Sequence, residues 1–394
     1  ISIQRDDNSP DCASEVDVTG NRCHDNAEFG IIFQSSSGRA KNNECWGNRT
    51  FSGIGIHRGK ATPDCPSEVL VIGNHCHQNE QAGIIFSSSK GRVENNTCRN
   101  SKTRSGIIIQ RNSDYPNYPS EVDVVGNKCH DNEQSGIVFF SSRGRVENND
   151  CWGSRAQSGI SIQRDDNSPD CASEVDVIGN RCHKNEKAGI AFLSSRGRVE
   201  DNNCWSSRTL SGISIERDQK SPDCASEVDV IGNRCHENEQ SGIVFFSSRG
   251  RVENNDCWGS RAQSGISIQR DDNSPDCASE VDVIGNRCHH NKQSGIALIA
   301  NIGHSESNIV WANGATGTPE PIASADTHSP RALRIAHLAA TGRPAAVAQT
   351  AALADFLLSG GCQGCFDQFW HHKLGSPPQP VLIAQPPASS ASKP

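Results

Sequence analysis

The chemically reactive cluster that occurs only once in this chain lies near its C-terminal end. Cys362 and Cys365 are followed by His371 and His372 in a C-x2-C-x5-H-H arrangement. Thiolates and imidazoles are common zinc ligands, so these four residues can form a zinc site. A redox-active thiol pair is an alternative, as are small residues packed within a helical cap. The spacing leaves these three interpretations open.

A second candidate is the hexapeptide Asp-Asp-Asn-Ser-Pro-Asp, which occurs three times. Its aspartates are Asp6, Asp7 and Asp11; Asp165, Asp166 and Asp170; and Asp271, Asp272 and Asp276. Clustered carboxylates can bind Ca²⁺. Asp and Asn also hydrogen-bond to the backbone of tight turns, which gives the same sequence a purely structural role. The equivalent segments HRGKATPD and QRNSDYPN lose the cluster, so calcium is an expectation for only some of these loops.

A third candidate combines aromatic and basic residues that recur every 53 residues. The tryptophans are Trp46, Trp152, Trp205, Trp258 and Trp311, with Arg99 in the remaining slot. Two rows of arginines accompany them, Arg39, Arg92, Arg145, Arg198 and Arg251, and Arg143, Arg196 and Arg249. Such residues can stack on sugar rings and pair with acidic groups along a linear glycan. The alternative is a Trp folded over a corner of the chain, with each Arg solvated or paired to the Glu two residues on.

These rows belong to an internal repeat. The segment Ser226–Ile243, SEVDVIGNRCHENEQSGI, has close copies beginning at Ser14, Ser67, Ser120, Ser173 and Ser279. Gly-Ile pairs divide each 53-residue unit into intervals of 23 and 30 residues. Runs such as GIVFF, RVENN, SEVDV and GISIQ indicate short strands, and SSRG, IGN and DDNSPD indicate turns. The strict period predicts an all-β solenoid of about eleven or twelve coils with stacked parallel strands.

The motif N-x-C occurs in both kinds of coil. Because side chains alternate along a strand, the Asn and the Cys of each pair face the same way. We expect an asparagine ladder at a bend and a mostly reduced cysteine ladder in the interior, with some disulfides as the alternative. The adjacent histidines (His24, His77, His130, His183, His236 and His289) should face outward or lie at turns. Two coils separate equivalent histidines by about 9.6 Å, which is too far for two of them to share a zinc ion.

The pattern V-x-G-N-x-C-x-x-N-x-x-x-G-I, alternating with R-V-x-N-N-x-C, resembles the right-handed parallel β-helix repeat. That repeat occurs in pectin-lyase-like proteins, mannuronan epimerases and periplasmic nitrous-oxide-reductase maturation proteins. The resemblance covers about residues 1–311 and implies the fold, with a secreted, periplasmic or cell-surface location. It does not specify an activity, because such solenoids serve as lyases, hydrolases, epimerases and non-catalytic binding rods.

The remaining sequence predicts an end to the solenoid. Residues 1–313 form the β-helix, 314–329 a linker, 330–376 a helical cap or small C-terminal domain, and 377–394 a disordered tail. A cap would block pairing at the exposed end strands. The chain starts in mid-repeat and contains no Met, so we expect an upstream segment of the natural protein. A net charge of −8 gives no reason to expect a nucleic-acid partner, and no apolar run is long enough to span a membrane.

Six loops project from the long coils, at 4–14, 57–67, 110–120, 163–173, 216–226 and 269–279. Insertions that stack along one edge of a solenoid are the preferred binding edge. We therefore predict a non-catalytic module that binds a polysaccharide or a protein partner through Asp165, Asp166, Asp170, Asp271, Asp272 and Asp276, with Trp152, Trp205 and Trp258. A polysaccharide lyase, hydrolase or epimerase is the alternative. Against it, Asn132–His183 is repeated letter for letter as Asn238–His289, so neither copy contains a unique catalytic cluster, and the Asp-Pro-His-Glu motif of the epimerases is absent.

Overall fold

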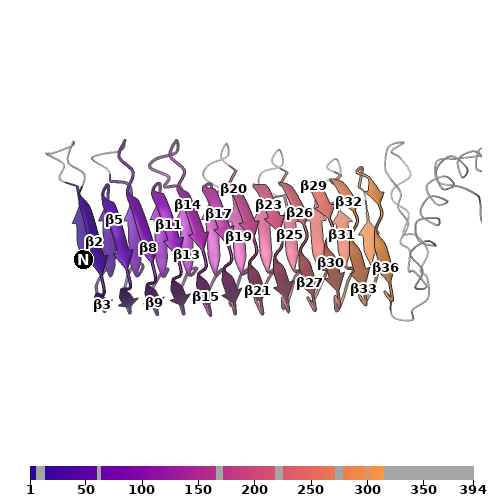
Figure 1. The fold of residues 1–394 in the computed structure, drawn as a ribbon, viewed down its shortest axis with the longest axis horizontal. Helices are drawn as coiled ribbons and strands as arrows, with labels where there is room; N and C mark the ends of the chain where they lie inside the picture. Colours follow the sequence, from indigo (N-terminus) through magenta and orange to yellow (C-terminus); the bar gives the residue numbers. More distant parts are fainter. Residues whose placement is uncertain are drawn as a thin grey trace, which may run out of the picture.

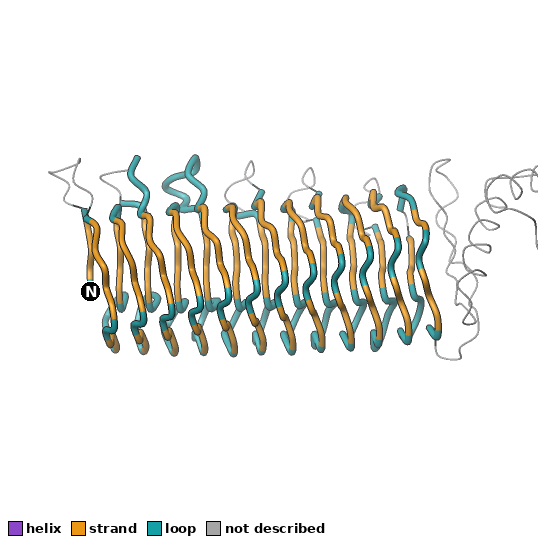
Figure 2. Tube along the Cα trace, viewed as in Figure 1, coloured by secondary structure: helices purple, strands orange, loops and turns teal. Residues whose placement is uncertain are grey.

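The computed structural model describes residues 1–5, 14–59, 64–165, 172–217, 225–270, 278–299 and 301–314. These residues form three parallel sheets of 12 strands each, and every coil contributes one strand to each sheet (Figure 1). Figure 2 shows that the described chain consists of strands and loops only. The predicted all-β solenoid and its number of coils are confirmed. The predicted C-terminal linker, helices and tail lie outside the described residues, apart from Gly314, the first residue of the predicted linker.

Each sheet is built from every third strand. Sheet A contains β1 (Ser2–Gln4), β4 (Ile31–Gln34), β7 (Ile54–His57), β10 (Ile84–Ser87), β13 (Ile107–Gln110), β16 (Ile137–Phe140), β19 (Ile160–Gln163), β22 (Ile190–Leu193), β25 (Ile213–Glu216), β28 (Ile243–Phe246), β31 (Ile266–Gln269) and β34 (Ile296–Leu298). Sheet B contains β2 (Glu15–Thr19), β5 (Ser37–Lys41), β8 (Glu68–Ile72), β11 (Lys90–Glu94), β14 (Glu121–Val125), β17 (Arg143–Glu147), β20 (Glu174–Ile178), β23 (Arg196–Glu200), β26 (Glu227–Ile231), β29 (Arg249–Glu253), β32 (Glu280–Ile284) and β35 (Ser305–Glu306). Sheet C contains β3 (Arg22–His24), β6 (Glu44–Trp46), β9 (His75–His77), β12 (Thr97–Arg99), β15 (Lys128–His130), β18 (Asp150–Trp152), β21 (Arg181–His183), β24 (Asn203–Trp205), β27 (Arg234–His236), β30 (Asp256–Trp258), β33 (Arg287–His289) and β36 (Ile309–Trp311).

The interior is a set of side-chain rows that run from coil to coil. In sheet A, Phe139, Ile162 and Phe192 are consecutive members of a row that alternates Phe with Ile. Sheet B contributes valines and sheet C contributes cysteines, and nearly all of these side chains are fully buried. A row that alternates large and small residues fills the space between coils at crystal-like density. The repeat therefore specifies the core as well as the register.

Glycine is required where two coils approach most closely in sheet B. A Cβ atom on Gly197 would lie 1.9 Å from the carbonyl oxygen of Val175, and the φ angle of Gly197 is +146°. Neither the contact nor the backbone conformation is accessible to another residue. This explains why the short coils carry Gly at the position where the long coils carry Val.

An asparagine ladder forms the bend between sheets B and C. One residue in the left-handed conformation turns the chain, for example Gly179 at φ +66°, and the Asn that follows it points inward. The Nδ2 group of Asn180 donates to Oδ1 of Asn202 at 2.9 Å, and Nδ2 of Asn149 donates to Oδ1 of Asn180 at 2.9 Å. These amides satisfy backbone groups that the bend takes out of the sheets. The predicted ladder is confirmed.

The cysteines of sheet C form a second continuous row. Cys129, Cys151 and Cys182 are register partners on adjacent strands and are fully buried, and Val310 ends the row. All twelve described cysteines are free thiols. Burial raises the pKa of the Cys129 thiol well above its usual value, because the interior disfavours the thiolate. The thiols therefore pack as small apolar side chains.

The described loops and the strands of sheet C lie at opposite edges of the solenoid. In Figure 1, the described loop of residues 110–120, between β13 and β14, projects from the upper edge, and the strands of sheet C lie along the lower edge. Among the described residues, the search for a helix long and apolar enough to cross a membrane finds none.

Candidate binding site

The outer face of sheet A carries a shallow groove beside β13 and β16. Its floor is the central outward-facing row of the sheet, which includes Ile85, Ile108 and Val138, with exposed fractions of 5%, 1% and 2%. These three side chains form an apolar cluster separate from the main core, with Phe29 and Phe140 packed against it. Outward residues can be this buried only because taller side chains stand on both sides of the row. The floor is apolar at Ile108, where the equivalent position of the next long coil is Ser161.

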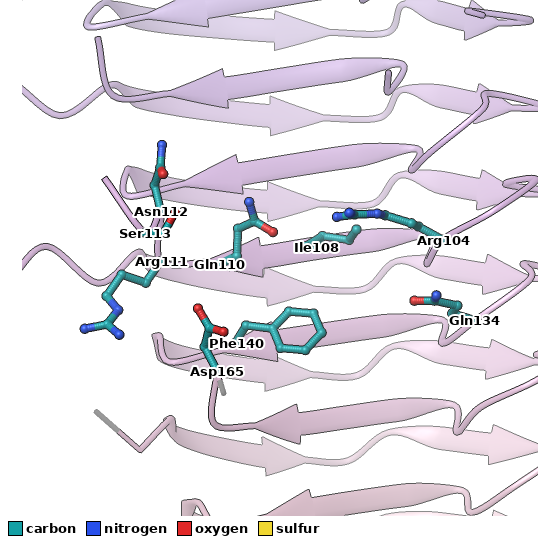
Figure 3. Close-up of a pocket in the computed structure, with 9 residues that line it drawn as sticks. All are labelled: Arg104, Ile108, Gln110, Arg111, Asn112, Ser113, Gln134, Phe140 and Asp165. Carbon is teal, nitrogen blue, oxygen red and sulfur yellow. The ribbon is translucent and has the colours of Figure 1, made fainter. Parts of the chain in front are cut away.

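A pocket of about 500 Å³ lies in this groove over Ile108. Figure 3 shows Arg104 and Gln134 at one end of the pocket, the start of the third loop at the other, and Ile108, Gln110 and Phe140 between them. The lining residues are Arg104, Ile108, Gln110, Arg111, Asn112, Ser113, Gln134, Phe140 and Asp165. Ile108 and Phe140 are the two apolar lining residues, and the other seven are polar or charged, so the pocket is mainly polar.

The two arginines of the pocket are in different surroundings. Arg104 is exposed in the turn between β12 and β13, and within the described part of the chain it makes no ion pair. Arg111 is buried at the base of the third loop, with 5% of its surface exposed. Asp165 follows β19 and is the one carboxylate among the lining residues. The pocket therefore offers hydrogen-bond donors in excess of acceptors.

The outer face of sheet B has a larger groove, of about 770 Å³, near the end of the described solenoid. Its charged side chains pair with one another: Arg196 lies 3.6 Å from Glu227, and Arg249 lies 3.5 Å from Glu280. In the other arginine row, Arg92, Arg145, Arg198 and Arg251 each pair with the Glu two residues on, as in Arg198–Glu200 at 3.0 Å. That arrangement confirms the structural alternative for these arginines. A face whose charges are already paired has less to offer a ligand than the sheet A pocket.

The tryptophans lie on sheet C, away from the loop edge with which the sequence prediction grouped them. Their rings stack with the histidines in one column, in which neighbouring ring centroids are 4.2–5.8 Å apart and the ring planes differ by 0–18°. Trp152, Trp205 and Trp258 each have a histidine on both faces. Their faces are therefore covered, and a sugar ring can reach only their edges.

Arg99 interrupts this column, because it stands in register between His77 and His130. Beyond the interruption, His130 to Trp311 form an unbroken stack. His183 and His289 are partly covered by the tryptophan rings, with 16% and 18% of their side chains exposed. Among the described residues, no group of three or more His, Cys, Asp or Glu could hold a metal ion. The histidines face outward, as expected, and they pack as members of the column.

Most of the predicted aspartates cannot be placed. Asp165 is described, and it lines the sheet A pocket. Asp166, Asp170, Asp271, Asp272 and Asp276 lie outside the described residues, as do the zinc candidates Cys362, Cys365, His371 and His372. Calcium in the loops and zinc at the C-terminal cluster stay predictions.

Sequence reasoning missed the residues that make the sheet A pocket. Arg104 and Ile108 stand where the next repeat has Gln157 and Ser161. In a chain whose copies are otherwise nearly identical, such departures are a signal of a local role. They were not interpretable alone, because the pocket requires four different segments to meet across adjacent coils.

His57 belongs to the same face, at the position that Gln34 and Gln110 occupy in their coils. Its ring stands edge-on to Phe29 at 5.3 Å between centroids, and its Nε2 atom is buried with no partner among the described residues. Burial lowers the pKa of His57 to about 4, because a charged imidazolium would lose its hydration there.

This low pKa makes the fold sensitive to acid. Above pH ~6.5 the imidazole is neutral in both the folded and the unfolded chain, so its contribution to stability is fully present. As the pH falls from about 6.5 towards about 4, the unfolded chain takes up the proton first, and stability falls by up to about 3 kcal/mol. Urea unfolding of the unmodified chain and of H57Q, compared at pH 7 and pH 4.5, should show a smaller acid loss for the variant. Parallel pH profiles for the two proteins would contradict the buried neutral imidazole.

Comparisons with known proteins agree with this architecture. The sequence matches the family model described as the right-handed β-helix region at residues 7–115, 85–220 and 158–319. No curated protein matches the sequence. Among solved structures, the A-module of the mannuronan C-5 epimerase AlgE6 of Azotobacter vinelandii is similar over 78% of this chain and 80% of that chain, with 14% identity and a TM-score of 0.51.

Two further structures are similar at lower scores. A mutant of the periplasmic alginate epimerase AlgG is 15% identical over 72% of this chain and 74% of that chain, with a TM-score of 0.45. The pectate lyase Pel9A is 11% identical over 71% of this chain and 70% of that chain, with a TM-score of 0.41. Similarity at this level concerns the fold alone. With three sheets in one parallel solenoid and a family match over most of its length, the chain belongs to the right-handed β-helix family.

Proposed function

We propose that this β-helix binds a polysaccharide along the outer face of sheet A and does so without chemical turnover. The observation that carries the proposal is the pocket over Ile108, because the fold by itself does not specify a function. The pocket lies on the outer face of a sheet that continues along the solenoid. An extended polymer can lie along that face and place one unit in the pocket.

The composition of the pocket fits a sugar. The Phe140 ring offers an apolar face of the kind on which the C–H side of a pyranose packs. Gln110, Gln134 and Asn112 supply amides that can both donate to and accept from hydroxyl groups. Arg104 adds a solvent-facing cation for an acidic or hydroxyl-rich unit.

The same lining argues against catalysis. Cleavage or epimerisation of a polysaccharide requires positioned acid and base groups, usually two. Among the described lining residues, Asp165 is the one carboxylate, and the pocket has no His, Tyr, Cys or Lys. Asp165 also recurs in the sequence as Asp6, Asp218 and Asp271, whereas a single active site would use residues that occur once.

A glycan-array screen of the full chain, followed by product analysis on every polysaccharide that binds, tests the proposal. We expect at least one linear polysaccharide to bind and to be recovered with unchanged length, unsaturation and epimer content. Appearance of cleaved, unsaturated or epimerised product would replace this function with that of an enzyme. Absence of binding across neutral and acidic polysaccharides would refute it.

A further inference from the structure

Arg111 is a buried arginine with two hydrogen-bond donors that have no acceptor among the described residues. It follows β13, and its backbone N–H donates to the carbonyl oxygen of Phe140 at 3.1 Å. Its side chain is 95% buried beneath the third loop, since 5% of its surface is exposed. The Nη1 group donates to the carbonyl oxygen of Pro116 at 2.5 Å. The Nε and Nη2 groups are buried and have no hydrogen-bond partner in the described part of the chain.

A buried guanidinium in this state is energetically unfavourable. Arginine remains protonated in proteins, so it cannot escape the cost by losing its charge. Each buried N–H without an acceptor has lost the hydrogen bond that it makes to water in the unfolded chain. The hydroxyl of Tyr115, in the same loop and 8% exposed, is a further buried donor without a partner among the described residues. The third loop thus holds several donors for which the described chain provides no acceptor.

The sequence and the contacts together distinguish this loop. At the same position of their repeats, Arg5, Arg164 and Arg270 are followed directly by two aspartates and Arg217 by one. Arg58 is followed by Gly59, but its Nε group donates to the carbonyl oxygen of Ser88 at 3.0 Å. The Nε groups of Arg5, Arg164 and Arg217 also have no hydrogen-bond partner among the described residues, whereas Nη2 is without one in Arg111.

Arg111 is followed by Asn112 and Ser113. The Oδ1 atom of Asn112 accepts from the backbone N–H of Asp114 at 3.0 Å, so it is not available to the guanidinium in that role. Asp114 itself is exposed. The third repeat has kept the cation and lost the adjacent carboxylates.

We propose that Arg111 is the centre of an oxyanion-binding site, which takes a sulfate, phosphate or carboxylate group in place of the missing aspartates. Arg111, Asn112 and Ser113 all line the sheet A pocket, so an anion can reach the loop base from solvent. In Figure 3 the Arg111 side chain extends to the loop side of the pocket, away from Phe140. The Nε and Nη2 groups point the same way on a guanidinium edge, and two oxygens of one oxyanion can accept from them together.

This site stands independently of polysaccharide binding. The pocket can bind a neutral glycan with the anion site unused, and a free anion can bind with no glycan present. The two proposals therefore fail in different experiments, one by glycan array and the other by anion titration.

Titration of the full chain with sodium sulfate at constant ionic strength, set by sodium chloride, tests the site through thermal unfolding and calorimetry. The unmodified chain should show saturable, one-to-one binding and a rise in Tm that follows the occupied fraction. R111M should lose the sulfate response. R164M is the matched control, because the arginine that it removes is followed by Asp165 and Asp166, and it should keep the response.

The variant N112D/S113D gives the sharpest test, because it restores the Asp-Asp of the other loops beside Arg111. It should fold, be at least as stable as the unmodified chain without sulfate, and bind sulfate at least tenfold more weakly. An unmodified chain that does not respond to sulfate, or an R111M response equal to that of the unmodified chain, would overturn the site. Titration with phosphate tests whether a free ion binds. Titration with sulfated dextran, compared with dextran, tests whether a sulfate group on a polymer binds. Saturable binding of either one that depends on Arg111 supports the site.

Discussion

Replacement of Asn180 by alanine is expected to lower the free energy of unfolding by about 4 kcal/mol, one of the two largest effects that we expect from a single substitution. Its Nδ2 group donates to the carbonyl oxygens of Val146 and Ile178 at 2.9 and 3.1 Å and to Oδ1 of Asn202 at 2.9 Å. Its Oδ1 atom accepts from the backbone and side-chain N–H groups of Asn149, both at 2.9 Å. Alanine removes these five hydrogen bonds, and the buried backbone N–H of Asn149 loses its acceptor.

Urea unfolding followed by circular dichroism measures the effect, and N203A is its control. Asn203 is on the next coil, and its side-chain oxygen has no hydrogen-bond partner among the described residues. Its replacement should change stability by less than about 0.5 kcal/mol. Equal losses for N180A and N203A would mean that the ladder contributes little to the stability of the solenoid.

The second large effect is expected for Phe192. Its side chain is fully buried between Ile162 and Ile215 of the adjacent coils. Truncation to alanine removes most of the ring's apolar surface from the core and leaves a cavity that the rigid coil stack cannot close. We expect a loss of about 4 kcal/mol in the free energy of unfolding.

F192L separates volume from shape in the same unfolding measurement. Leucine keeps most of the volume, and aliphatic residues already occupy alternate positions of this row, so the loss should stay below about 1.5 kcal/mol. Similar losses for the alanine and leucine variants would contradict a row that stabilises the fold by filling space. Hydrogen exchange of β19, β22 and β25 would show whether the loss is confined to neighbouring coils, as expected for a solenoid.

The fold could be predicted from the sequence because the same pattern of strands and turns occurs in every repeat. Invariant spacing fixes the register, and the period-2 relation within N-x-C places Asn180 and Cys182 on the inner side. Each inference needed only local geometry and the stacking of identical units. Val310 in a cysteine slot already indicated packing in place of disulfide chemistry.

The site could be predicted only in part. Asp165 was identified, but Arg104, Ile108 and Phe140, which line the same pocket, come from other coils. Whether these side chains enclose a pocket depends on the sizes of the outward-facing side chains on adjacent coils. The tryptophans were misplaced for a related reason. Trp152 and His183 occupy the same slot of successive coils, and their stacking becomes evident only when the two rows are interleaved in register. Departures from the repeat, as at Arg104, were the signal that was available and unused.

The affinity of one matched pair of variants tests the binding face most directly. Phe140 and Phe246 occupy the same position of identical repeats, but Phe140 neighbours Gln110 and the pocket floor at Ile108, whereas Phe246 neighbours Glu216. With a polysaccharide that binds the unmodified chain, calorimetry should give an affinity roughly tenfold lower for F140A, about 1.4 kcal/mol, and an affinity within about twofold for F246A. An unchanged affinity for F140A, or an equal loss for both variants, would contradict a specific binding site over Ile108 on sheet A.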